Sequence, residues 1–154
     1  MKILHLGIFD RQGGACIAAY RQHQALLQAG VDSTMWVRFK ITNDAHVLAY
    51  TPSPYWPIRL NRLWRRRQLK LQHKKFVQRG EFFDDRAEHG GRELENLPSA
   101  DVVNLQFGWK FVDLEGLFNK VPATIPIVVK MHEMAPFTGG CSYAGDCESY
   151  FRQC

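Results

Sequence analysis

The sequence predicts an α/β fold in which a parallel sheet carries helices on both faces. Short apolar runs rich in β-branched residues alternate along the chain with segments of helical periodicity, a pattern typical of βαβ units. At 154 residues, with 45% hydrophobic and 23% charged residues, the chain fits one globular domain with a sizeable core. This composition excludes a largely disordered chain.

The first predicted βαβ unit lies at the N-terminus. Residues 2–9 predict a strand, and a turn containing Gly13 and Gly14 leads into a helix that Gly30 is placed to end. The β-branched and aromatic content of residues 31–39 predicts a second strand. Strand, glycine turn and helix N-terminus form a natural anion site, because free backbone N–H groups point into the turn. A glycine pair by itself is more often a simple tight turn than a ligand site, and no full G-x-G-x-x-G motif is present.

The middle of the chain is strongly basic. Residues 45–80 hold nine of the twenty Lys and Arg and no Asp or Glu, although the whole chain is only +5. The remaining residues, eleven basic against fifteen acidic, are net −4. Residues 58–79 predict a helix with a Leu and Trp stripe and basic residues over its other faces, which suits an anionic membrane surface or a lipid-linked acceptor. The predicted contact residues are Arg62, Trp64, Arg65 and Arg66.

Two other interpretations of this basic helix stay open. In the first, the helix packs its Leu and Trp stripe on the domain and solvates its charges. In the second, it binds nucleic acid, although few aromatic residues are interleaved with the basic ones, as single-strand binding would need. No apolar stretch approaches the roughly 20 residues that cross a bilayer, and His5 and Asp10 interrupt any N-terminal signal sequence. We therefore expect a cytoplasmic protein.

The second half of the chain predicts further elements of the same fold. The polar residues 80–98 predict a loop with a short helix, and residues 101–107 predict a strand. Asp113 is placed to cap a helix within 111–120. The β-branched run at 125–129 then predicts a buried parallel strand.

This last strand is followed directly by His132. Ligands of open α/β sheets bind outside the carboxyl ends of the strands, so a titratable side chain at this place suits chemistry. The segment from His132 to Cys147, HEMAPFTGGCSYAGDC, resembles the His-Asp-x-Trp-Pro-Phe-Thr-Gly-Gly-Cys-His-Tyr-x-Gly-x-Cys signature of certain family 4 glycosyltransferases. Those enzymes are retaining, use nucleotide-sugars and are built as two Rossmann-like domains that face a cleft, the GT-B arrangement.

The resemblance implies that residues 1–154 are the Rossmann-like, acceptor-side half of a GT-B enzyme, truncated at the C-terminus and without the donor-binding second domain. It implies sugar transfer from a nucleotide-sugar to a polysaccharide or glycolipid acceptor, with no cofactor beyond that donor. The isolated chain is then expected to be inactive until a donor-binding domain or second chain completes it. Such enzymes often act at the inner face of a membrane, which implies a peripheral membrane location.

The resemblance also implies site residues. His132 matches a histidine that contacts the donor sugar, where a neutral imidazole helps an oxocarbenium-like transition state. The glycine loop faces the cleft in the same family. The implied substrate-binding residues are Gly13, Gly14, Gln106, Glu133, Thr138 and Gly139.

The departures from the family pattern at Gln106, Glu133 and Ala135 bear on the chemistry. Gln106 replaces a cleft-side histidine, and an amide hydrogen-bonds a hydroxyl but does not exchange a proton near neutral pH. Glu133 stands where Asp is usual and keeps the charge on a longer arm. Ala135 stands where Trp is usual, which removes a large aromatic ring from the loop.

Three cysteines crowd the C-terminal end, unlike the spread of a secreted disulfide scaffold. Their spacing is wider than a CxxC knuckle, so they are weak zinc candidates, and free thiols, a zinc remnant and a disulfide all stay open. They are Cys141, Cys147 and Cys154.

Two rival functions fit the same sequence. In the first, the chain is a non-enzymatic binding or regulatory half-domain. The missing donor half and the departures at Gln106 and Ala135 favour this alternative. The chain is a small nucleic-acid-binding protein in the second, in which the basic helix meets phosphates and binding depends strongly on salt.

Overall fold

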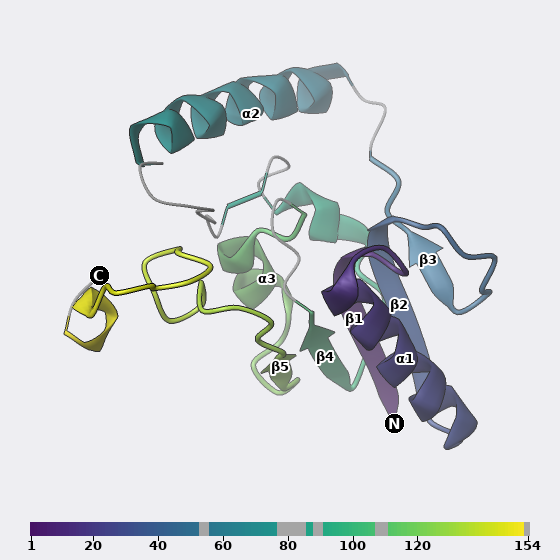
Figure 1. Cartoon of the computed structure of the whole chain (residues 1–154). Helices are drawn as coiled ribbons and strands as arrows, with labels where there is room; N and C mark the ends of the chain where they lie inside the picture. Colours follow the sequence, from purple (N-terminus) through teal and green to yellow (C-terminus); the bar gives the residue numbers. More distant parts are fainter. Residues whose placement is uncertain (53–55, 77–85, 88–90, 107–110, 153–154) are drawn as a thin grey trace.

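The computed structural model describes residues 1–52, 56–76, 86–87, 91–106 and 111–152. Five strands form one sheet in the order β3-β2-β1-β4-β5, and every neighbouring pair is parallel (Figure 1). The strands are β1 (Lys2–Phe9), β2 (Asp32–Phe39), β3 (Val47–Ala49), β4 (Val102–Leu105) and β5 (Ile127–Val129). The predicted α/β class with a Rossmann-like parallel sheet is confirmed.

The helices follow the same order as the prediction. They are α1 (Gly14–Gln28), α2 (Trp56–Phe76) and α3 (Leu114–Lys120), with short 3-10 turns η1 (Arg92–Asn96) and η2 (Ser149–Phe151). Helix α1 begins after Gly13 at φ 82° and ends before Gly30 at φ 76°. Both glycines therefore hold backbone angles that favour glycine, and Gly30 ends the helix as the sequence predicts.

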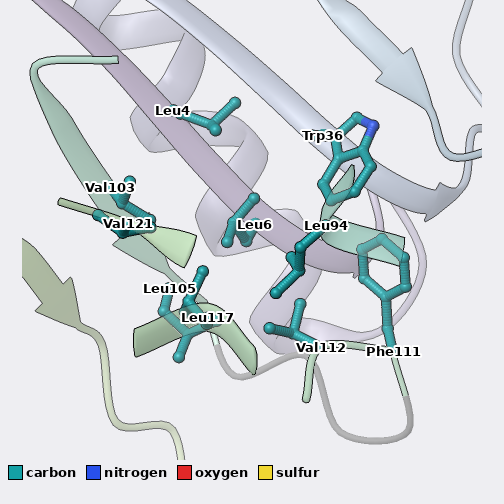
Figure 2. Close-up of a cluster of buried hydrophobic side chains, with 10 residues drawn as sticks. All are labelled: Leu4, Leu6, Trp36, Leu94, Val103, Leu105, Phe111, Val112, Leu117 and Val121. Atoms are coloured by element: carbon teal, nitrogen blue, oxygen red, sulfur yellow. The ribbon is translucent and has the colours of Figure 1, made fainter. Parts of the chain in front are cut away.

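Two apolar clusters cover opposite faces of the sheet, because successive strand residues point to opposite sides. On one face, Leu4 and Leu6 of β1 pack with β4, η1 and α3, as Figure 2 shows. On the other face, Met35 and Val37 of β2 pack with Ala19 of α1. The first cluster comprises Leu4, Leu6, Trp36, Leu94, Val103, Leu105, Phe111, Val112, Leu117 and Val121.

Asp113 ties three parts of the chain together. Asp113 is the N-cap of α3, as the sequence predicts, because its Oδ1 accepts a hydrogen bond from Gly116 N at 3.0 Å. Its Oδ2 accepts from Arg65 Nη2 of α2 at 2.7 Å, while Arg65 Nε donates to Ala87 O at 2.7 Å. Asp113 N in turn donates to the buried Glu93 at 3.0 Å. One buried carboxylate thus fixes both the start of α3 and the position of α2.

The structure corrects two predictions. Strand β5 is not buried, since Val128 and Val129 are 51% and 38% exposed, because β5 is the last strand of the described sheet. The segment after β2 holds the short strand β3, which the sequence analysis does not identify, and of its three residues only Val47 is buried. Residues 80–85 and 88–90 of the predicted loop, and residue 107 of the predicted strand, lie outside the described residues.

Candidate functional site

The candidate site lies where β1, β4 and β5 end side by side. Gln106 directly follows β4, and His132 follows β5 by three residues. Their side chains meet, with His132 Nε2 3.2 Å from Gln106 Oε1. The two residues are 26 positions apart in the sequence, and the parallel pairing of β4 with β5 brings them together. The structure therefore joins two of the residues that the sequence predicts for one site.

Gln106 connects this pair to residues that the sequence analysis missed. Its Nε2 donates to Gln22 Oε1 of α1 at 3.1 Å and to Asn104 Oδ1 of β4 at 3.2 Å. Gln106 is only 4% exposed, so these bonds satisfy an amide that burial would otherwise destabilise. A polar residue at one position of an otherwise ordinary helix gives no sequence signal, and Gln22 could not be singled out.

The environment of His132 favours its neutral form. Burial lowers the pKa of His132, nearby Lys130 lowers it further, and Glu133 acts in the opposite direction. The side chain is only partly buried, so a ligand can reach the ring. At neutral pH the group is an uncharged imidazole with one hydrogen-bond donor and one acceptor, suited to a hydroxyl-rich ligand.

The glycine loop occupies the carboxyl end of β1 on the same edge. An added Cβ at Gly13 or Gly14 would meet no atom within 4 Å, so the loop is open on that side. Among the described residues no side chain caps the N-terminus of α1, so its first N–H groups are available to an anion. Neighbouring Asp10 has a structural role, because its carboxylate accepts from Ile41 N and from Thr42 N and Oγ1. Burial alone would raise the pKa of Asp10, but these hydrogen bonds outweigh it and lower that pKa.

The remaining motif residues lie in a turn beyond His132. The Thr138 hydroxyl donates to Cys141 O at 2.7 Å, and Thr138 is 5% exposed, so this group shapes the turn. Gly139 is exposed in the same turn, and Glu133 is partly buried beside His132. Ala135, at the place of the family's Trp, is itself buried at 5% exposure. The loop therefore closes over the smaller side chain.

The structure gives the cysteines no metal-binding role among the residues it describes. Cys141 and Cys147 are exposed, and Cys154 lies outside the described residues. In the described part of the chain, no group of three or more His, Cys, Asp or Glu side chains is arranged to hold a metal ion.

Helix α2 contradicts the interpretation in which its apolar stripe packs on the domain. Arg65 faces the body of the protein and Arg62 is partly buried, whereas Arg66 is exposed. The apolar stripe points outward, with side chains 55% to 67% exposed, and it comprises Trp56, Leu60, Leu63, Trp64 and Leu71. In Figure 1, α2 lies across the end of the molecule toward which the strands run.

No protein-family model, curated protein or solved structure gives a significant match to the chain. Of the helices in the described segments, none has both the length and the apolar character needed to cross a membrane.

Proposed function

We propose that the chain is the acceptor-side half of a retaining glycosyltransferase that moves a sugar from a nucleotide-sugar to a polysaccharide or glycolipid acceptor. The observation that carries this proposal is the contact between His132 and Gln106 at the carboxyl edge of a parallel sheet. The family resemblance assigns both positions to the cleft, and they follow separate strands. The open glycine loop on the same edge adds a place for an anionic group.

The chemistry of these groups suits a sugar. Imidazole and amide side chains form directed hydrogen bonds to hydroxyls, and a neutral imidazole does so without the cost of burying a charge. In the proposed enzyme His132 contacts the reacting sugar, while Gly13 and Gly14 accommodate phosphate or acceptor groups. Glu133 adds a carboxylate next to the ring. The donor-binding residues belong to a separate domain or chain.

The direct test is ligand binding to the whole chain, followed by transfer. A panel of nucleotide-sugars and short saccharides is titrated into the ¹⁵N-labelled protein, and the signals of His132 are followed. His132→Ala is expected to weaken saccharide binding at least tenfold, whereas the surface variant His46→Ala keeps it. With a donor-binding domain added, His132→Ala is expected to abolish transfer with little loss of stability. Unchanged transfer in that variant would remove the assignment, and binding without any transfer would favour the non-enzymatic half-domain.

We further propose that α2 contacts an anionic membrane surface that presents a lipid-linked acceptor. The outward apolar stripe and the basic residues beside it suit such a surface, on which each Lys or Arg contributes about 1 kcal/mol. Because α2 lies at the end of the molecule toward which the strands run, the membrane would lie on the same side as the candidate site (Figure 1). A peripheral location at the inner face of a membrane follows from this proposal.

Vesicle co-sedimentation tests the membrane contact. Replacing Leu60 and Trp64 together by Ser is expected to weaken binding to vesicles containing anionic lipid at least tenfold, since both side chains would enter the interface. Gln68→Ala, an exposed polar change on the same helix, is expected to leave it unchanged. Equal binding to neutral vesicles refutes the electrostatic part. Salt-dependent binding to DNA or RNA that survives the double change would favour the nucleic-acid alternative.

A further inference from the structure

The donors and acceptors around Gln106 determine which ring nitrogen of His132 carries a hydrogen. Gln106 uses both amide hydrogens, because its Nε2 donates to Gln22 Oε1 at 3.1 Å and to Asn104 Oδ1 at 3.2 Å. Only its oxygen remains for His132, whose Nε2 lies 3.2 Å away. An amide oxygen accepts and never donates, so His132 Nε2 must carry a hydrogen.

This direction determines what the other ring nitrogen offers. In a neutral imidazole one nitrogen carries the hydrogen and the other is an acceptor, so a hydrogen on Nε2 leaves Nδ1 with a free lone pair. Within the described segments no hydrogen bond reaches Nδ1 of His132, and the ring is only partly buried. Reversing the arrangement would require the amides of Gln22, Asn104 and Gln106 to turn over together.

We propose that Gln22, Asn104 and Gln106 are positioning residues that hold His132 with Nδ1 as the acceptor for a hydroxyl group of the bound sugar. The identity of the ligand rests on the proposed function, whereas the direction of the network does not. An acceptor at Nδ1 selects a group that donates, and phosphate oxygens and ionised carboxylates only accept. His132 therefore meets a sugar hydroxyl, and the phosphates of a donor lie elsewhere, with the open glycine loop as their nearest suitable place on this edge.

The position of the hydrogen is measured by two-bond ¹H–¹⁵N correlations of the histidine rings in the full chain at pH 7.5. His132 is expected to show one tautomer, hydrogen on Nε2, with a proton that exchanges slowly enough to be seen. Gln106→Leu and Gln22→Leu are expected to lose that slow exchange. Gln24→Leu is the matched control, because Gln24 lies on the same helix and donates to Asp44 instead.

A conservative variant separates positioning from simple packing. Gln106→Glu keeps an oxygen for His132 Nε2 and adds a negative charge, so it is expected to retain the tautomer and raise the pKa of His132 by about 1 unit or more. Gln24→Glu should leave that pKa unchanged. Backbone amide spectra of each variant verify that it folds, and Gln106→Glu supplies the test if Gln106→Leu does not fold.

Two results overturn the inference: a wild-type His132 with its hydrogen on Nδ1, or a Gln106→Leu spectrum identical to wild type at that ring. The ligand is tested separately with monofluoro sugars, in which fluorine replaces one hydroxyl and removes its donor. Loss of the hydroxyl that meets Nδ1 is expected to weaken binding about tenfold. If the tautomer is as expected but no saccharide or nucleotide-sugar moves the His132 signals, the proposed function fails while the direction of the network stands.

Discussion

Acid stability should depend on His5, which lies at the centre of β1. The ring is fully buried, and within the described residues neither Nδ1 nor Nε2 has a hydrogen-bond partner. It packs edge-on against His23 of α1, with ring centroids 5.8 Å apart. Burial, His23 and Lys130 together lower the pKa of His5 from 6.5 to about 4. The folded protein therefore holds His5 neutral over a pH range in which the unfolded chain protonates it.

The sign and size of the effect follow from this difference. Between pH 6.5 and about 4 the unfolded chain binds a proton that the folded chain refuses, so stability is lost as the pH falls. Each pKa unit corresponds to about 1.4 kcal/mol, so the free energy of unfolding should drop by about 3 kcal/mol across this range. Burial lowers the pKa of His23 as well, against the attraction of Asp44, so His23 adds to the same trend.

His5→Leu removes the titrating group and replaces it by an apolar side chain of similar size. At pH 7.5 the variant should be as stable as wild type or more so, because His5 forms no side-chain hydrogen bond with the described residues. Urea unfolding at pH 7.5, 6 and 5 should show a flatter pH dependence, with the part due to His23 still present. His46→Ala, at a surface histidine whose side chain is 56% exposed, should retain the full His5 contribution. An equally steep pH dependence in His5→Leu and wild type would refute the reasoning.

Two predictions concern the junction of η1, α2 and α3, and urea unfolding measures both. Gly116→Ala should lower the free energy of unfolding by about 1–3 kcal/mol, because its Cβ would lie 2.7 Å from Gly91 Cα. Gly14→Ala is the control and should leave the stability unchanged, because its Cβ would meet no atom within 4 Å. Equal stabilities of the two variants would contradict this prediction. Asp113→Ala should cost about 1 kcal/mol more than Asp113→Asn, because only Asn keeps an oxygen for the α3 cap, and both lose the ion pair with Arg65; a reversed order would contradict the role of the cap.

The N-terminal half of the fold was predictable because its signals are local. An apolar run, a glycine turn, helical periodicity and Gly30 define β1, α1 and β2 within about one residue of the observed ends. Strand β3 lacked such a signal, since it has three residues and buries only Val47. The run at 125–129 correctly predicted a strand, but an apolar run does not say which neighbours will cover it, and Val128 is half exposed.

For helix α2, the sequence did not predict which side of the helix packs on the protein. Periodicity identified a Leu and Trp stripe, yet which side of an amphipathic helix meets the protein depends on partners far away in the sequence. Here the partner is Asp113, 48 residues from Arg65, and their contact turns the apolar stripe outward. The family resemblance likewise singled out His132 and Gln106, whereas Gln22 becomes visible only when α1 folds over the sheet and its side chain reaches Gln106.

The arrangement of polar residues on the sheet is the strongest reason to treat this edge as a binding site. Residues that pair in register on neighbouring strands point to the same face of the sheet. His5 of β1 and Asn104 of β4 are such a pair, and they lie side by side on the face that α1 covers. A face that served packing alone would be apolar there, as it is at Met35 and Val37. Instead the chain buries His5 with no hydrogen-bond partner among the described residues. It holds Asn104 and Gln106 in a directed network that ends at the partly exposed His132. Departures from good packing concentrate at functional sites, because selection there acts on ligand binding as well as on stability. If the His5→Leu variant gains acid stability while Gln106→Leu loses the ordered ring of His132, then the polar residues of this face have separate roles: His5 affects stability, whereas Gln106 positions His132.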